Sequence, residues 1–308
     1  VMPESTTLII VNRTKSYGAE VVLYGQVYDE ACAKAYELSE KHGYTFVHPF
    51  DDFDVATGQG TIAMEIIQDL PTVDYILAPI GGGGLITGIA TFAKMLNPNI
   101  KIIGVEPAGA ASMTAALEAG HVVTLPSANT IADGTAVKTV GEQIFPYVQK
   151  NVDQVVTVED DEIVTTFLDM VENHKMVAEN SGLLSVAAAQ KLDFLKGKRV
   201  VCVISGGNMD VITMSSVIQN GLILRDRVFT ISVLLPDRPG QLAEITKVIA
   251  EQKGNVIKLE HNQFVSVNRN LAVELRVTME AFGTEHKHQI IEELRKNGFD
   301  PQVVDAKL

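Results

Sequence analysis

Four consecutive glycines, Gly81 to Gly84, stand between an apolar strand-like run and an apolar helix-like run in the stretch YILAPIGGGGLITGIATFAKML (75–96). Glycine loses more conformational freedom on folding than any other residue, so four in a row indicate that bare backbone is needed there. Between a strand and a helix, such backbone presents free N–H groups at the helix N-terminus, where a phosphate can bind. The alternative is a tight turn with close packing.

Two common phosphate-binding patterns do not fit this stretch. The dinucleotide fingerprint requires glycines at positions i, i+2 and i+5, and counting from Gly81, Gly82 or Gly83 meets another residue type each time. The P-loop requires Gly-Lys-Ser/Thr, whereas Gly88 is followed by Ile-Ala. A phosphate carried by some other cofactor remains as the functional interpretation.

Composition limits the class of protein. The 308 residues are 46% hydrophobic and 20% charged, which is typical of a globular protein with room for two domains. A net charge of −13 argues against a nucleic-acid partner. The two distant cysteines, Cys32 and Cys202, make neither a disulfide framework nor a metal motif. No run approaches the roughly 20 apolar residues of a membrane span, and the N-terminus lacks a secretory signal. We therefore expect a cytoplasmic protein.

Strand-like and helix-like segments alternate over the first 222 residues. We expect strands at 19–25, 44–50, 99–107 and 198–207, the strand–glycine–helix unit at 75–96, and helices at 28–43, 61–70, 111–120, 158–177 and 183–195. Buried strands alternating with helices predict an α/β fold with a mostly parallel sheet covered on both faces. After Arg225 the order becomes βαββαβ, the ferredoxin-like arrangement. The predicted domains are 1–225 and 226–308.

Six segments carry a resemblance to a known family. In order they are DDFDVATGQGT (51–61), PIGGGGLITGIA (79–90), IIGVEP (102–107), IADGTAV (131–137), VAENSG (177–182) and VISGGNMD (203–210). Together they resemble the threonine/serine dehydratases, fold-type II pyridoxal-phosphate enzymes to which serine racemase is a close relative. The resemblance implies that pyridoxal 5′-phosphate is the cofactor, held by Gly81, Gly82, Gly83, Gly84 and the Leu85 amide. It also implies that Ser205 faces the pyridine nitrogen and that Glu179 lies near the ring. A helix N-cap and a helix-start carboxylate are the respective alternatives for these two residues.

The same resemblance implies a cation site and a missing nucleophile. Glu106 and the Ala110 carbonyl correspond to a cation site of some relatives, but Ser112 stands where those relatives have an acidic ligand, which leaves a monovalent ion. The family's Schiff-base lysine lies in a Ser-Phe-Lys-x-Arg-Gly-Ala stretch, and its substrate loop is Ser-x-Gly-Asn-His; neither occurs in this sequence. We therefore expect a truncated dehydratase with no catalytic residue of its own, inactive by itself.

The second domain resembles the ACT domain through LLPDRPGQLAEITKVIAEQKGNVIKL (234–259). The resemblance implies an amino-acid effector bound between the first strand-to-helix turn and the facing strand of a second copy, and hence a homodimer or tetramer with ACT–ACT pairing. The implied contacts are Asp237, Pro239, Gly240, Gln241, Leu242, Asn255, Val256 and Ile257. Their apolar members suit a branched-chain amino acid. The alternative is a dimerisation module that binds nothing.

Three functions follow from these resemblances. The first is a threonine dehydratase that converts L-threonine to 2-oxobutyrate and ammonia by β-elimination, accepts L-serine less well, and is regulated through the ACT domain. Because 2-oxobutyrate feeds isoleucine synthesis, isoleucine or valine is the expected effector. The second is a catalytically dead amino-acid sensor. The third is a serine racemase or serine dehydratase relative, which product analysis with threonine and serine would distinguish.

Overall fold

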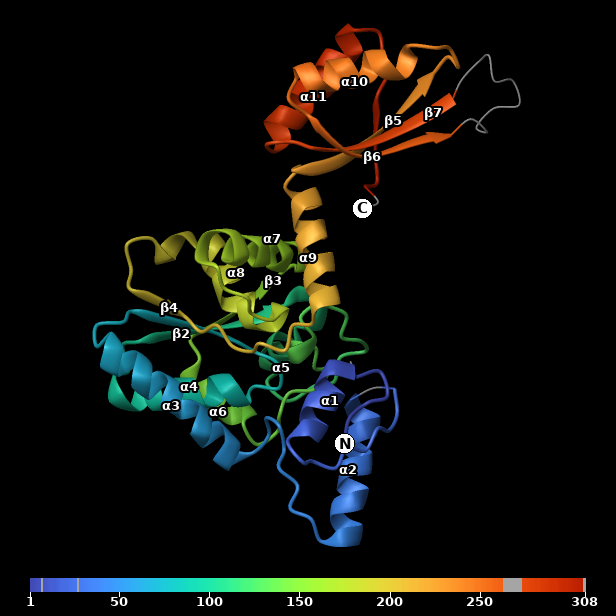
Figure 1. Cartoon of the computed structure of the whole chain (residues 1–308). Coiled ribbons are helices and arrows are strands. Elements are labelled where there is room, and N and C mark those ends of the chain that lie inside the picture. Colours follow the sequence, from blue (N-terminus) through green and yellow to red (C-terminus); the bar gives the residue numbers. More distant parts are fainter. Residues whose placement is uncertain (7, 27, 263–272, 307–308) are drawn as a thin grey trace. The chain divides into compact units, whose positions relative to one another are not determined.

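The computed structural model describes residues 1–6, 8–26, 28–262 and 273–306. The chain divides into two compact units, each described separately below (Figure 1). The first comprises Val1–Thr166 and Lys175–Val211, and the second comprises Phe167–His174 and Ile212–Leu308. The domain boundary after Arg225 stays a prediction.

A four-stranded parallel sheet forms the centre of the first unit. Its strands are β1 (Tyr75–Pro79), β2 (Lys101–Pro107), β3 (Gln154–Val158) and β4 (Val200–Cys202), in the order β3-β2-β1-β4. The two central strands are buried along almost their whole length, as expected for strands with helices on both faces. This confirms the predicted parallel sheet.

Successive residues of these strands point to opposite faces and enter two separate apolar clusters. Ile76 and Ile102 belong to one cluster, whereas Leu77 and Ile103 belong to the other. The helices of this unit are α1 (Leu8–Ser16), α2 (Tyr28–His42), α3 (Phe53–Asp69), α4 (Gly84–Leu96), α5 (Ser112–Ala119), α6 (Phe145–Asn151), α7 (Asp160–Asp169) and α8 (Leu184–Lys191), although α7 ends in the second unit. Residues of α3 and α4 enter the first cluster and residues of α7 and α8 the second, so both faces are covered.

Two predicted strands were wrong, and two predicted helices have other bounds. Residues 19–25 contribute only an isolated bridge between Leu23 and Met2, and residues 44–50, all described, form no strand. In the latter segment Phe46 stacks on Tyr36 of α2 at 4.2 Å between ring centroids, and His48 meets Phe46 and Phe50 edge to face. The helix expected at 61–70 begins earlier, at Phe53, because the Asp52 carboxylate caps it. The helix expected at 158–177 ends at Asp169 and continues as a π-helical turn, Met170–His174.

The second unit has the predicted βαββαβ order. After α9 (Val211–Leu224) come β5 (Val228–Leu235), α10 (Gln241–Glu251), β6 (Asn255–Asn262), β7 (Val273–Glu280), α11 (Thr284–Lys296) and β8 (Gln302–Val304). The strands form an antiparallel sheet in the order β6-β7-β5-β8. Alternate residues of β5, such as Phe229 and Ile231, pack with Ile245 and Ile290 of the two helices. In the described parts of both units, no helix combines the length and the apolar character that crossing a membrane requires.

Candidate functional site

The candidate site lies where three parallel strands end. The carboxyl ends of β1, β2 and β4 lead directly to the glycine run, to Gly109 and to Ser205, and ligands of open α/β sheets bind at this edge. The motifs lie against one another there. A Cβ atom on Gly81 would lie 3.1 Å from the Thr135 Cα, one on Gly134 would lie 3.0 Å from Glu179 Oε1, and one on Gly206 would lie 2.2 Å from Glu179 Cδ. These contacts bring the motifs at 79–90, 131–137, 177–182 and 203–210 together, and the motifs at 51–61 and 102–107 also contact the one at 79–90.

Close packing requires glycine throughout the run. A Cβ on Gly82 would lie 2.1 Å from the Phe50 ring, and one on Gly84 would lie 2.7 Å from the Phe50 carbonyl oxygen. Gly83 has a φ of +104°, which side-chain-bearing residues rarely adopt, and a Cβ there would meet Ile144 at 2.5 Å. The tight-turn interpretation of the glycines therefore holds in the structure.

The phosphate interpretation is supported by the backbone donors of the same turn. Among the described residues, the N–H groups of Gly81 to Leu85 have no hydrogen-bond acceptor, while the neighbouring Ile80 N–H donates to Val105 and the Thr87 N–H to Gly83. They stand at the N-terminus of the 13-residue helix α4, which favours negative charge. This donor set fits a phosphate group.

Glu179 and Ser205 have surroundings that argue against their alternatives. Glu179 occupies the N-cap position of a short 3₁₀ helix, Asn180–Leu183, yet its side chain makes no capping bond; Glu179 Oε2 instead accepts the Asn208 N–H at 3.2 Å. Ser205 lies well before the start of α9 and so does not cap that helix. A Cβ on Gly182 would lie 1.6 Å from the Ser205 carbonyl oxygen, so the backbone at Ser205 passes directly against Gly182.

His48 supports the segment that packs on the glycine turn. Its Nδ1 accepts the N–H groups of Phe50 at 3.3 Å and Asp51 at 2.8 Å, so the neutral ring carries its proton on Nε2. Burial lowers the pKa of His48 below its usual value near 6.5, while Asp51 and Asp52 oppose the shift.

The lowered pKa of His48 predicts acid sensitivity of the first unit. Because the folded pKa lies below the unfolded one, the stabilisation is complete above about pH 6.5 and is lost as pH falls through the folded pKa. We expect the urea midpoint of the first unit to fall below pH 6.5, and less steeply in His48→Asn, whose amide oxygen still accepts. Equal pH profiles for the two proteins would contradict this role.

Glu106 acts as a helix cap in this structure. It is fully buried, and its carboxylate accepts hydrogen bonds from the Met113 N–H at 2.6 Å and from the N–H and hydroxyl of Thr114 at 2.9 and 2.7 Å. Burial raises the pKa of Glu106, and these hydrogen bonds oppose the rise. Ala110 and Ser112 are also buried, and the Ser112 hydroxyl has no hydrogen-bond partner in the part of the chain that the structure describes. Within the described ranges no three His, Cys, Asp or Glu side chains gather as a metal site. The cation site stays a prediction.

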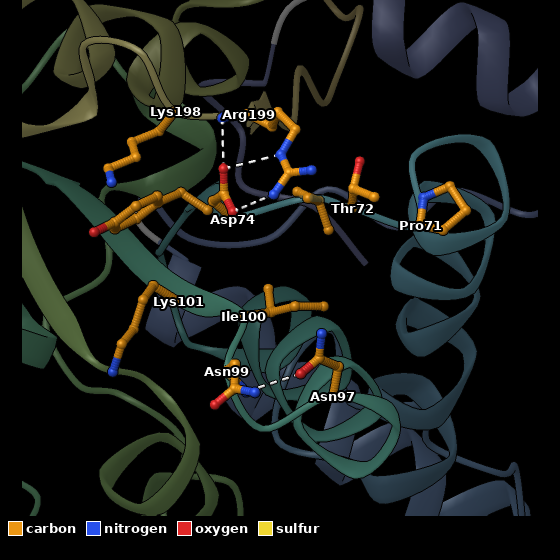
Figure 2. A pocket seen from close by; sticks show the side chains of 11 residues that line it. Pro71, Thr72, Asp74, Asn97, Asn99, Ile100, Lys101, Lys198 and Arg199 are labelled. Atoms are coloured by element: carbon orange, nitrogen blue, oxygen red, sulfur yellow. Dashed lines mark hydrogen bonds and ion pairs between the residues drawn. The ribbon is translucent and has the colours of Figure 1, made fainter.

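A separate cavity of about 310 Å³ lies at the opposite edge of the sheet, where the strands begin (Figure 2). Its wall contains Arg199, which donates to both carboxylate oxygens of Asp74 and lowers the pKa of Asp74 to about 2. Lys101, on the same wall, pairs with Asp153. The positive charges of Arg199 and Lys101 are thus each balanced by a carboxylate. The cavity is also remote from the predicted cofactor residues.

In the second unit, five of the predicted effector residues line one cavity of about 320 Å³. They are Asp237, Pro239, Gly240, Gln241 and Leu242, and Arg238 and His261 complete its polar wall. Gly240 has a φ of +99° and precedes α10 directly. The other three predicted residues, Asn255, Val256 and Ile257, stand on β6 and do not line this cavity: Asn255 donates to Glu280 and Val256 packs on the core.

Three residues at the first site were not predicted from the sequence. Phe50 covers the glycine turn, Asp51 accepts amides of residues 142–144, and the buried Asn180 has an amide oxygen without a partner in the described chain. Asp51 begins the motif at 51–61, Asn180 stands in the motif at 177–182 and Phe50 directly precedes residue 51, but the resemblance gave none of the three a role.

Two family models match the chain. The model described as pyridoxal-phosphate dependent enzyme matches residues 1–206, and the model described as ACT domain matches residues 229–299. Over 300 residues the chain is 43% identical to a protein named L-threonine ammonia-lyase from Geobacter sulfurreducens, covering 97% of this chain and 74% of that protein. A protein of the same name from Thermotoga maritima is 39% identical over 305 residues, covering 99% and 76%.

Solved structures similar to this chain include a threonine deaminase and a serine racemase. The processed form of threonine deaminase isoform 2 from Solanum lycopersicum superposes with a TM-score of 0.68 at 44% identity, over 71% of this chain and 65% of that one. Maize serine racemase gives a TM-score of 0.66 at 32% identity, over 72% and 69%. The chain therefore belongs to the family of pyridoxal-phosphate dependent enzymes and carries an ACT domain at its C-terminal end.

Proposed function

We propose that the protein is a threonine ammonia-lyase, which converts L-threonine to 2-oxobutyrate and ammonia and is regulated through its ACT domain. The observation that carries the proposal is the 43% identity, over nearly the whole chain, with a relative named L-threonine ammonia-lyase. The amides of the glycine turn, which have no acceptor among the described residues, support it, since they are donors suited to a phosphate at the expected place.

In this proposal the chain binds pyridoxal 5′-phosphate at the carboxyl edge of the sheet. The amides of Gly81 to Leu85 would hold the phosphate, the Ser205 hydroxyl would meet the ring nitrogen, and Glu179 would lie near the ring. When bound, the cofactor would accept the electron pair left by loss of the substrate's Cα proton, and return of that pair would expel the β-hydroxyl. A neutral serine would favour protonation of the ring nitrogen less than a carboxylate would. The ring would then withdraw electrons less strongly, which suits elimination.

The absence of the family's lysine motif from the sequence leads to a second prediction. We expect borohydride reduction of this chain with one equivalent of cofactor to label no single lysine preferentially, because no lysine here lies in that motif and exposed lysines react with the aldehyde only non-specifically. Peptide mass spectrometry checks this. A single modified lysine, for example Lys138, would overturn the prediction.

The function is tested with the complete gene product, by measuring 2-oxobutyrate from L-threonine and pyruvate from L-serine. We expect threonine to react faster. The likeness to maize serine racemase favours a second candidate function, for which D-serine would be the main product. No product from either amino acid would favour the amino-acid sensor.

We also propose isoleucine or valine as the effector and pairing of two ACT domains through β6. This strand lies at an edge of its sheet, and Ile257 and Leu259 on it are partly exposed. A cytoplasmic location and a monovalent cation at Glu106 and Ala110 belong to the same proposal. The unpartnered Ser112 hydroxyl supports the cation, and a higher melting temperature in potassium than in choline chloride would test it.

A further inference from the structure

Asp51 connects two segments that border the glycine turn. Its carboxylate accepts the N–H groups of Glu142 at 3.2 Å, Gln143 at 2.9 Å and Ile144 at 3.3 Å. The Gln143 side chain also donates to the Asp51 carbonyl oxygen at 3.0 Å. Hydrogen bonds to a charged acceptor are stronger than those between neutral groups. Residues 142–144 are thus tied to Asp51 at several points.

The residue before this segment, Gly141, contacts the glycine turn. Its N–H donates to the Gly82 carbonyl oxygen at 3.0 Å. A trans peptide is planar, with its C=O and N–H pointing in opposite directions. Fixing the Gly82 carbonyl toward Gly141 therefore turns the Gly83 N–H away from Gly141. That N–H belongs to the set that has no acceptor among the described residues.

The same carboxylate is close to Gly141. A Cβ atom on Gly141 would lie 2.5 Å from Asp51 Oδ1, so only glycine allows the contact. On the other side, Phe50 packs on Gly82 and Gly84. Residues 50 and 51 therefore hold the turn both directly and through residues 141–144.

We propose that Asp51 is a positioning residue for cofactor binding, which aims the Gly83 N–H at the phosphate through Gly141 and the Gly82 carbonyl. The inference rests on the proposed phosphate site at Gly81 to Leu85.

The direction in which Asp51→Asn changes phosphate binding distinguishes a positioning role from charge repulsion alone. A carboxylate near a phosphate repels it, so removing the Asp51 charge would by Coulomb interaction alone strengthen phosphate binding. The positioning role predicts weaker binding, because an asparagine amide accepts the three N–H groups less well than a carboxylate does.

The test measures dissociation constants for pyridoxal 5′-phosphate and for pyridoxal, which lacks the phosphate, by equilibrium dialysis of the chain. The variants are Asp51→Asn and Gly141→Ala; the second disturbs the same contact without changing any charge. Asp52→Asn is the matched control, since it removes the neighbouring charge, and asparagine still caps α3 in place of the Asp52 carboxylate. Circular dichroism verifies that each variant is folded.

We expect Asp51→Asn and Gly141→Ala to weaken pyridoxal 5′-phosphate binding about tenfold. Pyridoxal binding should stay the same, and Asp52→Asn should change neither constant by more than about twofold. Equal or tighter binding of pyridoxal 5′-phosphate by Asp51→Asn would overturn the inference, as would an equal loss for both ligands. A wild-type chain that binds no pyridoxal 5′-phosphate would contradict the cofactor site itself, and the inference would fall with it.

Discussion

Replacing Gly182 with alanine is expected to lower the free energy of unfolding of the first unit by about 3 kcal/mol. The added Cβ would lie 1.6 Å from the Ser205 carbonyl oxygen and 2.7 Å from the Ser205 carbonyl carbon. Both atoms are backbone, so no side-chain rotation relieves the clash. The Ser205 segment has to move, and it carries the hydroxyl expected to meet the ring nitrogen. We therefore also expect pyridoxal 5′-phosphate binding to be lost.

Urea unfolding of the first unit, together with cofactor dialysis, measures both effects. Gly207→Ala is the matched control, because Gly207 lies in the same segment, has no atom within 4 Å of an added Cβ and does not need a positive φ. It should change stability by no more than about 0.5 kcal/mol. A Gly182→Ala variant as stable as Gly207→Ala, with normal cofactor binding, would contradict the arrangement of Gly182 against Ser205.

The second large effect is expected in the ACT domain, where Gly240→Val should reduce binding of isoleucine or valine by at least about a hundredfold, or 2.7 kcal/mol. Among the described residues no atom lies within 4 Å of a Cβ added at Gly240, so the Cβ itself would have open space there. The branched side chain of valine would project beside the cavity-lining backbone and strain the turn, whose φ is +99°. Calorimetry with the whole chain measures the loss.

Gly298→Val controls for the strain. Gly298 lies in the same unit, has a φ of +86° and also has open space around an added Cβ, but it does not line the cavity. Both variants should lose about 1–3 kcal/mol of stability, while only Gly240→Val should lose effector binding. If both variants lost effector binding equally, backbone strain alone would explain the loss. No heat from the wild-type chain with either amino acid would leave only a dimerisation module.

The parts of the fold that were predictable from the sequence are those with strong local patterns. The central strands β1 and β2 are continuous apolar runs because both faces are buried, and the βαββαβ order of the second unit follows from regular alternation. Residues 44–50 have strand composition but pair with no strand among the described residues; their rings contact one another edge to face and Phe46 stacks on Tyr36 instead. Tertiary contact decides such a segment, and one sequence carries no record of it.

In the candidate site, too, residues that stand in recognisable motifs were predictable, whereas contacts between distant segments were not. The glycine run, Glu179 and the Ser205 segment were identified through motifs, and the structure brings them together. The roles of Phe50 and Asp51 were not predicted, although Asp51 begins the motif at 51–61, because their partners, the glycine turn and residues 142–144, lie far away in the sequence. The sequence also could not decide between phosphate binding and close packing for the glycines. In the structure, neighbouring residues pack closely on the run because glycine has no side chain, while the backbone N–H groups of the run stay available for an anion.

The most direct test of the account is a crystal structure of the chain with pyridoxal 5′-phosphate. We expect the phosphate at the N-terminus of α4, within hydrogen-bond distance of the amides of Gly81 to Leu85, and the ring beside Ser205 and Glu179. A phosphate bound elsewhere, for instance among Lys101, Lys198 and Arg199 in the cavity of Figure 2, with the glycine amides left unpaired, would contradict it.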